Sequence, residues 1–477
     1  MKKNLIVILF FALSLAGFSQ NEIVGYAPEF IGQDVTLYTY QDYVTMNRIA
    51  IGEGKVRESD SSFTISVQTN STIKGIVEIG RVEASLYIAP ETDYKIYFAG
   101  STEPASYQNS QTNIYFADLD TLDINYMVLQ YHQWFETFVA YNEKPMAAGG
   151  FLAYLDTFKL YAEKAYKDVD DPFFITYVRY DIAEMEQTYG GNGSSEQRLQ
   201  TFLDYIQPFP IYYENDRYMK FMLAFYDKEF REYLPVTEAA IMTAIHRKSP
   251  TLLMQTLKSD VFLANPKLRE LVMVDKLGKA FYREIHYRPN IIAILDSVSL
   301  QAKSQVNSTV ARNVKKYITN LEPGYPAPAI SLNKSAEEKV TWENYRGKFV
   351  YFNFFATWNE RSMNDMEIIS RLVPKYDEDI AFVSVCTDKD SSTFAAFKKQ
   401  YPEYEWEIYY VGEDENLMRS FKVTSIPNYY LVDQDGFIFS APALAPSPNG
   451  EYESVEKTLF KIKKALHPQE KIRVGEK

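Results

Sequence analysis

The spacing of apolar residues in the first part of the chain is typical of β-strands. From about Tyr26 to Ala99, apolar side chains recur at every second position in short runs broken by turn residues such as Gly52-Glu53-Gly54 and Pro90-Glu91. The clearest runs are Val35-Leu37-Thr39, Phe63-Ile65-Val67 and Tyr94-Ile96-Phe98. This period of two predicts antiparallel strands in a small sandwich or barrel.

After about Asp120 the period changes. Phe151, Leu155, Phe158 and Ala162 follow one another at intervals of four, three and four, which places them on one face of a helix. Similar patterns continue to about Leu321, with interruptions rich in proline and glycine. We therefore predict a helical domain or connector in this segment.

The last part of the chain alternates between strand and helix patterns. It begins with a segment of three prolines, Glu322–Pro328, which predicts an extended linker. The nearly continuous apolar and aromatic run Phe349–Phe355 predicts a buried central strand, and Ile380–Cys386 predicts a second one. Helices are expected at about Arg361–Tyr376 and around Phe394–Lys399. Strands joined through helices indicate a sheet with parallel members.

These patterns predict a multi-domain α+β protein. It has an N-terminal antiparallel β domain, a central helical region and a C-terminal α/β domain. The expected segments are a signal peptide 1–19, a β-rich sandwich-like domain 20–118, a helical domain or connector 119–321, a linker 322–328, the α/β domain 329–468 and a tail 469–477.

The first nineteen residues have the composition of a secretory signal peptide. Met1-Lys2-Lys3 is followed by the apolar run Leu5–Leu15 and then by Gly17-Phe18-Ser19, after which we expect cleavage. The apolar run is shorter than the roughly 20 residues that span a bilayer, so no transmembrane anchor is expected after removal of the signal. The sequence thus predicts export to the periplasm or cell envelope.

Charge and histidine placement restrict the function classes. The net charge is −13, and loss of residues 1–19, whose only charges are Lys2 and Lys3, makes it −15. An acidic chain is a poor partner for nucleic acid. His132, His246, His286 and His467 are dispersed without paired metal-ligand spacing, and no glycine-rich phosphate loop is present, so we expect neither a metal nor a cofactor.

Three blocks of the C-terminal segment carry a family resemblance. In order they are Asn344–Lys348, then Phe355-Ala356-Thr357-Trp358 after the first predicted strand, and Val423–Gly436 around Ile426-Pro427. Together they resemble the thioredoxin-like domain of TlpA-like and related redoxin proteins of the AhpC/TSA type. The resemblance implies a thioredoxin-like fold, a Cys-x-x-Cys motif directly after the tryptophan, and a cis peptide bond at Pro427.

The chain departs from this family at the motif itself. Asn359 and Ser362 stand where the family has its two cysteines, with Glu360 and Arg361 between them. Thiol-disulfide exchange requires a thiolate, which the family generates at a helix N-terminus. We therefore expect a degenerate site that runs no redox cycle. Asn, Ser and acidic residues at this position also favour capping of the helix that follows.

Cys386 is the one cysteine of the chain. It ends the second predicted strand, where an inert buried thiol is the ordinary interpretation. The alternative is a single reactive thiol that attacks a peroxide or forms a mixed disulfide.

The sequence leaves three functions open. The first is a non-enzymatic exported protein that binds a protein or peptide partner in a groove formed by Trp358, Ser425, Ile426 and Pro427. The second is an oxidoreductase that uses Cys386. The third is a structural component of an envelope assembly.

Overall fold

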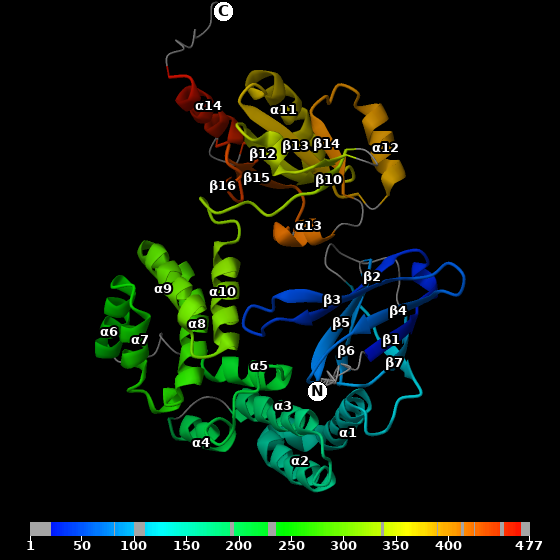
Figure 1. Ribbon diagram of the computed structural model, residues 1–477, viewed down its shortest axis with the longest axis vertical. Coiled ribbons are helices and arrows are strands. Elements are labelled where there is room, and N and C mark those ends of the chain that lie inside the picture. Colours follow the sequence, from blue (N-terminus) through cyan, green and yellow to red (C-terminus); the bar gives the residue numbers. More distant parts are fainter. Residues whose placement is uncertain are drawn as a thin grey trace, which may run out of the picture. The chain divides into compact units, whose positions relative to one another are not determined.

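The computed structural model describes residues 21–80, 82–99, 110–190, 195–227, 235–334, 338–388, 390–411, 415–423, 425–448 and 453–468 (Figure 1). The chain divides into two compact units. Of the described residues, one unit holds those up to Asp227 except Ser110, and the other holds Ser110 and those from Pro235 onward. The predicted signal peptide lies outside the described residues.

The first unit begins with two β-sheets. Their strands are β1 Asn21–Tyr26, β2 Asp34–Tyr40, β3 Arg48–Lys55, β4 Ser62–Val67, β5 Ile73–Ile79, β6 Val82–Ile88, β7 Tyr94–Phe98, β8 Ser110–Gln111 and β9 Ile114–Ala117. One sheet has the order β4-β1-β7-β9 and the other β3-β2-β5-β6-β8. The pairs β1–β4, β7–β9, β2–β3, β2–β5 and β5–β6 are antiparallel, as the sequence predicts, whereas β1 runs parallel to β7.

Alternation along the strands builds one hydrophobic core between the two sheets. Phe63 and Ile96 of the first sheet and Leu37 and Val77 of the second belong to the same buried cluster. Gly25 lies within this core, where an added Cβ would be 2.0 Å from Cζ of Phe63. The ring of Phe63 therefore fills the space that a side chain on β1 would need.

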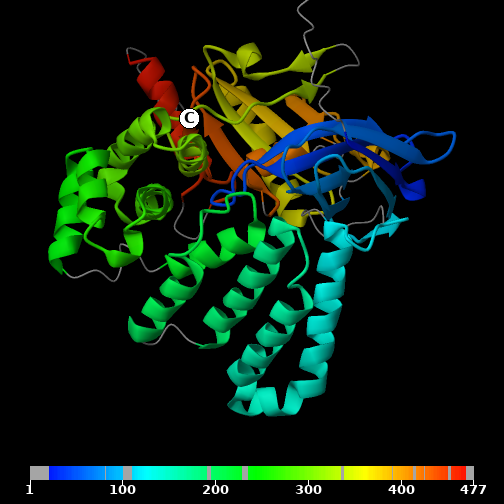
Figure 2. The same cartoon turned by 60° about the horizontal axis from the view of Figure 1, so that its bottom comes forward.

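In the described part of the first unit, the sheets are followed by five α-helices, with the short π-helical segment Met146–Gly150 between the first two; Figure 2 shows this helical region. The α-helices are α1 Ile124–Pro145, α2 Phe151–Ala165, α3 Pro172–Gly190, α4 Ser195–Tyr205 and α5 Asp216–Phe225. The helical face predicted from sequence is the buried face of α2, because Leu155, Phe158 and Ala162 are buried there. Asn125 of α1 fixes the helices to the sheet, since its amide accepts from Tyr87 N at 2.7 Å and donates to Tyr87 O at 2.8 Å.

The second unit contains a further set of helices and the C-terminal domain. The helices are α6 Pro235–His246, α7 Pro250–Leu257, α8 Pro266–Arg283, α9 Arg288–Gln301 and α10 Gln305–Thr319. Contacts join them to the domain that follows: Arg288 pairs with Glu322 at 3.0 Å, and Asn320 donates to Ser420 O at 3.2 Å. The predicted helical segment 119–321 thus contributes helices to both units.

The C-terminal domain is built on a five-stranded sheet of order β14-β13-β12-β15-β16. Its elements are β10 Leu332–Asn333, β11 Lys339–Val340, β12 Phe349–Phe355, α11 Glu360–Tyr376, β13 Ile380–Cys386, α12 Ser391–Gln400, β14 Glu407–Tyr410, α13 Glu415–Ser420, β15 Asn428–Val432, β16 Ile438–Ser440 and α14 Val455–Leu466. The strands β12, β13 and β14 are parallel to one another, whereas β15 and β16 are antiparallel to their neighbours.

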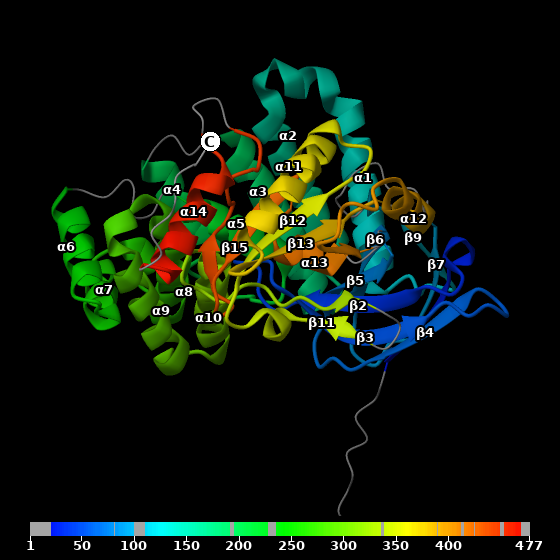
Figure 3. The same cartoon turned by 90° about the horizontal axis from the view of Figure 1, so that it is seen from above.

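Both faces of this sheet are covered. Buried residues of α11, α12 and α14 pack on one face and residues of α13 on the other; Figure 3 shows α11 and α14 over the strands. A strand buried on both faces is apolar at nearly every position, which explains the composition of β12; its one polar residue, Asn353, is buried and accepts from Ser384 Oγ at 2.7 Å. The predicted bounds of β12 and β13 are confirmed to the residue.

The proline-rich segment 322–328 begins with a turn, in which Tyr325 N donates to Glu322 O at 3.2 Å and Gly324 has a φ of 82°, and the segment is hydrogen-bonded into the C-terminal domain. Gly324 N donates to Ile438 O at 2.7 Å, and Ile438 N donates to Tyr325 O at 2.7 Å. Ala327 N donates to Gly436 O at 2.9 Å, and Trp342 Nε1 donates to Pro328 O at 2.7 Å. The segment predicted as a linker therefore continues the sheet edge next to β16.

Candidate functional site

The candidate site lies where β12 ends and α11 begins. Asn359 is the N-cap residue of α11, because its Oδ1 accepts from Ser362 N at 2.9 Å. Glu360 and Arg361 are exposed in the first turn, while Ser362 is buried, with its Oγ 3.5 Å from Ala356 N. Asn359 thus satisfies a backbone N–H of the first helical turn that would otherwise lack a partner, whereas the Ser362 hydroxyl faces the loop before the helix.

The Asn359 side chain also reaches the loop that contains Pro427. Its Nδ2 donates to Ile426 O at 3.2 Å, and the Ile426–Pro427 peptide bond is cis. The cap fixes which end of the carboxamide faces the helix, so the amide nitrogen faces Ile426. One side chain therefore joins two segments that lie 67 residues apart in the sequence.

Exposed side chains lie on both segments. Trp358 has 65% of its surface exposed, Ser425 is exposed, and Ile426 and Pro427 are half-buried. We call these four residues the Trp358 surface. The hydrogen bond from Asn359 to Ile426 places its two parts next to each other.

Asp388 holds the loop before α11 in place. Its carboxylate accepts from Thr357 N at 3.0 Å and from Thr357 Oγ1 at 2.6 Å, and the residue is buried. The sequence interpretation did not include Asp388. The available signal is its position two residues after β13, because the carboxyl ends of parallel strands meet at one edge of a sheet.

A second buried carboxylate, Asp365 of α11, joins this helix to β15 and to the loop that contains Ser447. Asp365 accepts from the Tyr429 hydroxyl and from Ser447 N, the latter at 3.1 Å. Burial, followed by the Asp365 charge, raises the pKa of Tyr429, so its hydroxyl stays protonated and donates. The sequence interpretation also missed Asp365, which its helical periodicity places on the buried face with Met366 and Ile369.

Cys386 is on the adjacent strand, opposite Phe355, and is fully buried. Its side chain belongs to the apolar cluster beneath α11. Burial raises the pKa of the thiol above its ordinary value, which disfavours the reactive thiolate. The structure does not bring Cys386 to the Trp358 surface.

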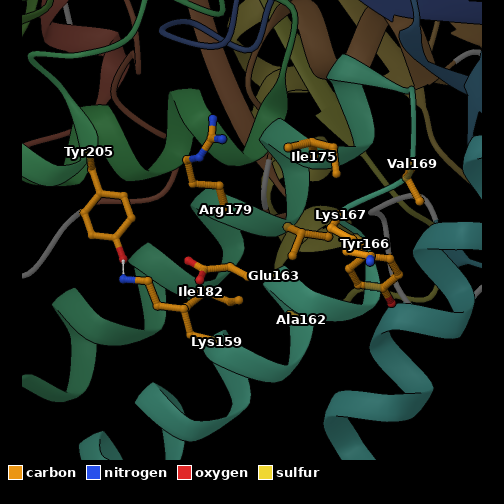
Figure 4. A pocket seen from close by; sticks show the side chains of 11 residues that line it. Lys159, Ala162, Glu163, Tyr166, Lys167, Val169, Ile175, Arg179, Ile182 and Tyr205 are labelled. Carbon is orange, nitrogen blue, oxygen red and sulfur yellow. Dashed lines mark hydrogen bonds between the residues drawn. The ribbon is translucent and has the colours of Figure 1, made fainter.

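A separate cavity of about 370 Å³ lies among α2, α3 and α4 of the first unit (Figure 4). Ile175, Val178 and Ile182 form an apolar wall, and Lys159 lies beside the Tyr205 hydroxyl. Lys159 and Tyr205 both bind Glu186, at 3.2 and 2.7 Å. These polar groups satisfy one another, so they tie the three helices together.

No group of three or more His, Cys, Asp or Glu side chains is placed to hold a metal ion within the described parts of the chain. The same described residues contain no helix that combines the length and the apolar character needed to cross a membrane.

Comparison with known proteins identifies the C-terminal domain. The sequence model of the AhpC/TSA family matches residues 323–441, which contain the parallel strands, α11 and the Pro427 loop. Residues 323–441 form a redoxin domain of the thioredoxin-like type. The match begins within the proline-rich segment, in agreement with the hydrogen bonds that join it to the sheet.

Curated relatives of the redoxin domain are named as thiol-disulfide oxidoreductases or as thioredoxin-like proteins. The thiol-disulfide oxidoreductase ResA of Bacillus thuringiensis subsp. konkukian is 27% identical over 117 residues, which are 24% of this chain and 66% of the relative. The thioredoxin-like protein YneN of Bacillus subtilis is 26% identical over 121 residues, 25% of this chain and 69% of the relative. The chain thus spans only about two thirds of the relatives it matches.

Solved structures also match part of this chain. A thiol-disulfide oxidoreductase from Bacteroides fragilis is 20% identical, with 29% of this chain and 98% of that chain covered and a TM-score of 0.25.

Proposed function

We propose that the redoxin domain binds an extended segment of a protein partner at the Trp358 surface and catalyses no thiol-disulfide exchange. The observation that carries the proposal is the N-terminus of α11: Asn359 caps the helix, Ser362 is buried in its first turn, and the exposed Trp358 directly precedes Asn359, which is hydrogen-bonded to the Pro427 loop.

The proposed lack of redox chemistry follows from the number and the location of the cysteines. Disulfide exchange proceeds by attack of a thiolate, and closing a disulfide needs a second thiol. Cys386 has no second cysteine in the chain, is fully buried and has a raised pKa. The names of the relatives favour an oxidoreductase, but the side chains at this site do not supply that chemistry.

Binding of an extended segment is supported by the exposed groups. Tryptophan is a frequent anchor of protein interfaces, where a buried ring contributes a large share of the binding energy. Main-chain pairing with an exposed backbone segment requires no thiol. Asn359 donates to Ile426 O, so an incoming peptide has to displace one hydrogen bond of 3.2 Å to pair with that carbonyl.

Export to the periplasm or cell envelope is part of the proposal. It rests on the charged, apolar and small-residue composition of residues 1–19. Cell fractionation, together with the intact mass of the protein from the extracytoplasmic fraction, tests it. A cytoplasmic protein that retains Met1 and Lys2 would contradict it.

The binding test uses a permanently unfolded polypeptide, reduced and carboxymethylated α-lactalbumin, immobilised on a biosensor. We expect the full chain to bind and Trp358→Ala to bind about ten-fold more weakly, as for an interface anchor. The matched control is Phe460→Ala, which removes an exposed aromatic ring from α14 of the same domain. Equal effects of the two substitutions, or no binding at all, would contradict the proposal.

The redox part is tested by insulin reduction with dithiothreitol and by peroxide consumption. We expect no turnover by the natural sequence. The variant that carries both Asn359→Cys and Ser362→Cys is the positive control, because a cysteine at a helix N-terminus has a lowered pKa. Turnover by the natural sequence that Cys386→Ala abolishes would establish the oxidoreductase alternative.

A further inference from the structure

Three tyrosines form a row across the outer face of the sheet β4-β1-β7-β9. Tyr26 of β1 lies opposite Tyr97 of β7, and Tyr97 lies opposite Tyr115 of β9. The ring centroids are 5.5 Å apart in the first pair and 6.4 Å apart in the second. The exposed fractions are 44% for Tyr26, 40% for Tyr97 and 59% for Tyr115. The three rings therefore form one continuous aromatic strip on the surface of the first unit, which we call the tyrosine row.

Alternation along the strands determines this arrangement. The neighbouring residues of Tyr26 and Tyr97 in the same strands, such as Ile96 and Phe98, face the core of the sandwich. A pair of tyrosines on neighbouring strands also stabilises a sheet, and this stabilisation would be a sufficient reason for one such pair. Three adjacent large rings at the surface expose a contiguous apolar area to water, which is unfavourable. Such exposed areas are typical of interaction sites.

The rest of the outer face is polar and nearly uncharged. The outward positions of the four strands, besides the tyrosine row, are Glu22, Val24, Ser62, Thr64, Ser66, Lys95 and Ala117. Glu22 and Lys95 carry opposite charges, and Lys95 also pairs with Asp118, directly after β9, at 3.9 Å, whereas the chain as a whole carries a net charge of −13. The hydroxyl groups of serine, threonine and tyrosine each donate and accept hydrogen bonds.

These properties select the chemical class of the ligand. A nucleic acid requires several cations, and the face offers one, Lys95. A proline-rich peptide binds in aromatic-lined grooves, whereas the tyrosine row lies on the surface of a sheet. A neutral polysaccharide presents flat C–H faces to aromatic rings and hydroxyl groups to hydroxyl groups, and it needs no charge. We propose that the tyrosine row binds a neutral polysaccharide chain that crosses the strands. This proposal is independent of the function of the redoxin domain.

The test is native affinity electrophoresis of the full chain in gels that contain laminarin, xyloglucan or yeast α-mannan. We expect at least one of these polysaccharides to retard the protein. Loss of the central ring in Tyr97→Ala is expected to weaken binding about ten-fold, since an aromatic contact contributes roughly one kcal/mol and its neighbours lose their shared strip. Tyr97→Phe retains the ring and is expected to keep binding within about three-fold.

Two further variants keep the result interpretable. Tyr115→Ala lies on the edge strand β9, so it removes a ring of the row with little effect on the core. Tyr141→Ala removes a tyrosine that is 85% exposed on α1 of the same unit and is expected to bind as the natural sequence does. Thermal unfolding confirms that each variant is folded. Absence of retardation in all three gels would overturn the proposal. So would equal binding by folded Tyr97→Ala, Tyr115→Ala and Tyr141→Ala, or binding of a decaproline peptide that Tyr97→Ala abolishes while no polysaccharide binds.

Discussion

Substitution of Asn359 separates the two hydrogen bonds that its carboxamide makes. The oxygen accepts from Ser362 N at 2.9 Å and caps α11, and the nitrogen donates to Ile426 O at 3.2 Å. In Asn359→Ser the hydroxyl can still cap the helix but is too short to reach the Pro427 loop. In Asn359→Ala both hydrogen bonds are lost. The two variants therefore measure the helix cap and the contact between the segments separately.

The magnitudes follow from these contacts. Loss of the hydrogen bond to Ile426 should cost about 1 kcal/mol in the free energy of local opening, the usual net value for a hydrogen bond. Loss of the cap costs about 1 kcal/mol more. Asn359→Ala should thus destabilise the start of α11 by about 2 kcal/mol, a change of about thirty-fold in the opening equilibrium. Asn359→Ser should show about half of that free energy.

The assay is native-state hydrogen exchange, followed by mass spectrometry on peptides from the start of α11 in the full chain. The matched control is Asn364→Ala, an exposed position of the same helix, where alanine should be neutral or slightly stabilising. Equal exchange in Asn359→Ser and Asn359→Ala would mean that the cap contributes nothing. Wild-type exchange in both would refute the two hydrogen bonds altogether.

Three other predictions concern buried groups. Cys386 is buried with a raised pKa, so a maleimide should label it only as fast as the domain unfolds; labelling within seconds in native buffer would contradict its burial. Burial lowers the pKa of His132 below its ordinary 6.5. The unfolded state then binds the proton first, and the His132 contribution to stability, present above pH 6.5, should be lost as pH falls. Urea unfolding at pH 7.5 and 5.5 should show a smaller pH effect in His132→Gln, and an unchanged effect would exclude this origin. Gly25→Ala should destabilise the first unit by about 1–3 kcal/mol, because its Cβ would overlap the Phe63 ring; thermal unfolding should show partial rescue by Phe63→Leu, and a neutral Gly25→Ala would contradict the close approach.

Local patterns in the sequence were sufficient to predict the helices and strands, but not to predict which strands pair or which helices pack together. The nearly continuous apolar run Phe349–Phe355 defines β12, because a strand buried on both faces is apolar at almost every position and Asn353 lies in its interior, away from its ends. Alternation in Tyr94–Phe98 shows which side chains face the core, yet it carries no information that β7 pairs parallel with β1. The same limit applies to the helices, whose periodicity does not tell which unit they join.

In the candidate site, too, some residues could be predicted from the sequence and others could not. Asn359 and Ser362 could be placed because the motif positions are adjacent to Trp358 in the sequence. Asp388 and Asp365 could not, because their hydrogen-bond partners lie 31 and 64 residues away and only the fold brings them together. A buried carboxylate is recognised by its partners, and these are set by tertiary structure.

The hydrogen bonds of the segment 322–328 have a practical consequence for dividing the chain. A fragment that begins at Ala329 would lose the backbone bonds of Gly324, Tyr325 and Ala327 and would leave the edge of β16 unpaired. Unpaired strand edges promote association between molecules. A protease should likewise cleave this segment slowly despite its prolines and glycine, because its backbone is held in the sheet. The smallest fragment of the C-terminal domain that is expected to fold without an exposed sheet edge therefore begins before the prolines of this segment.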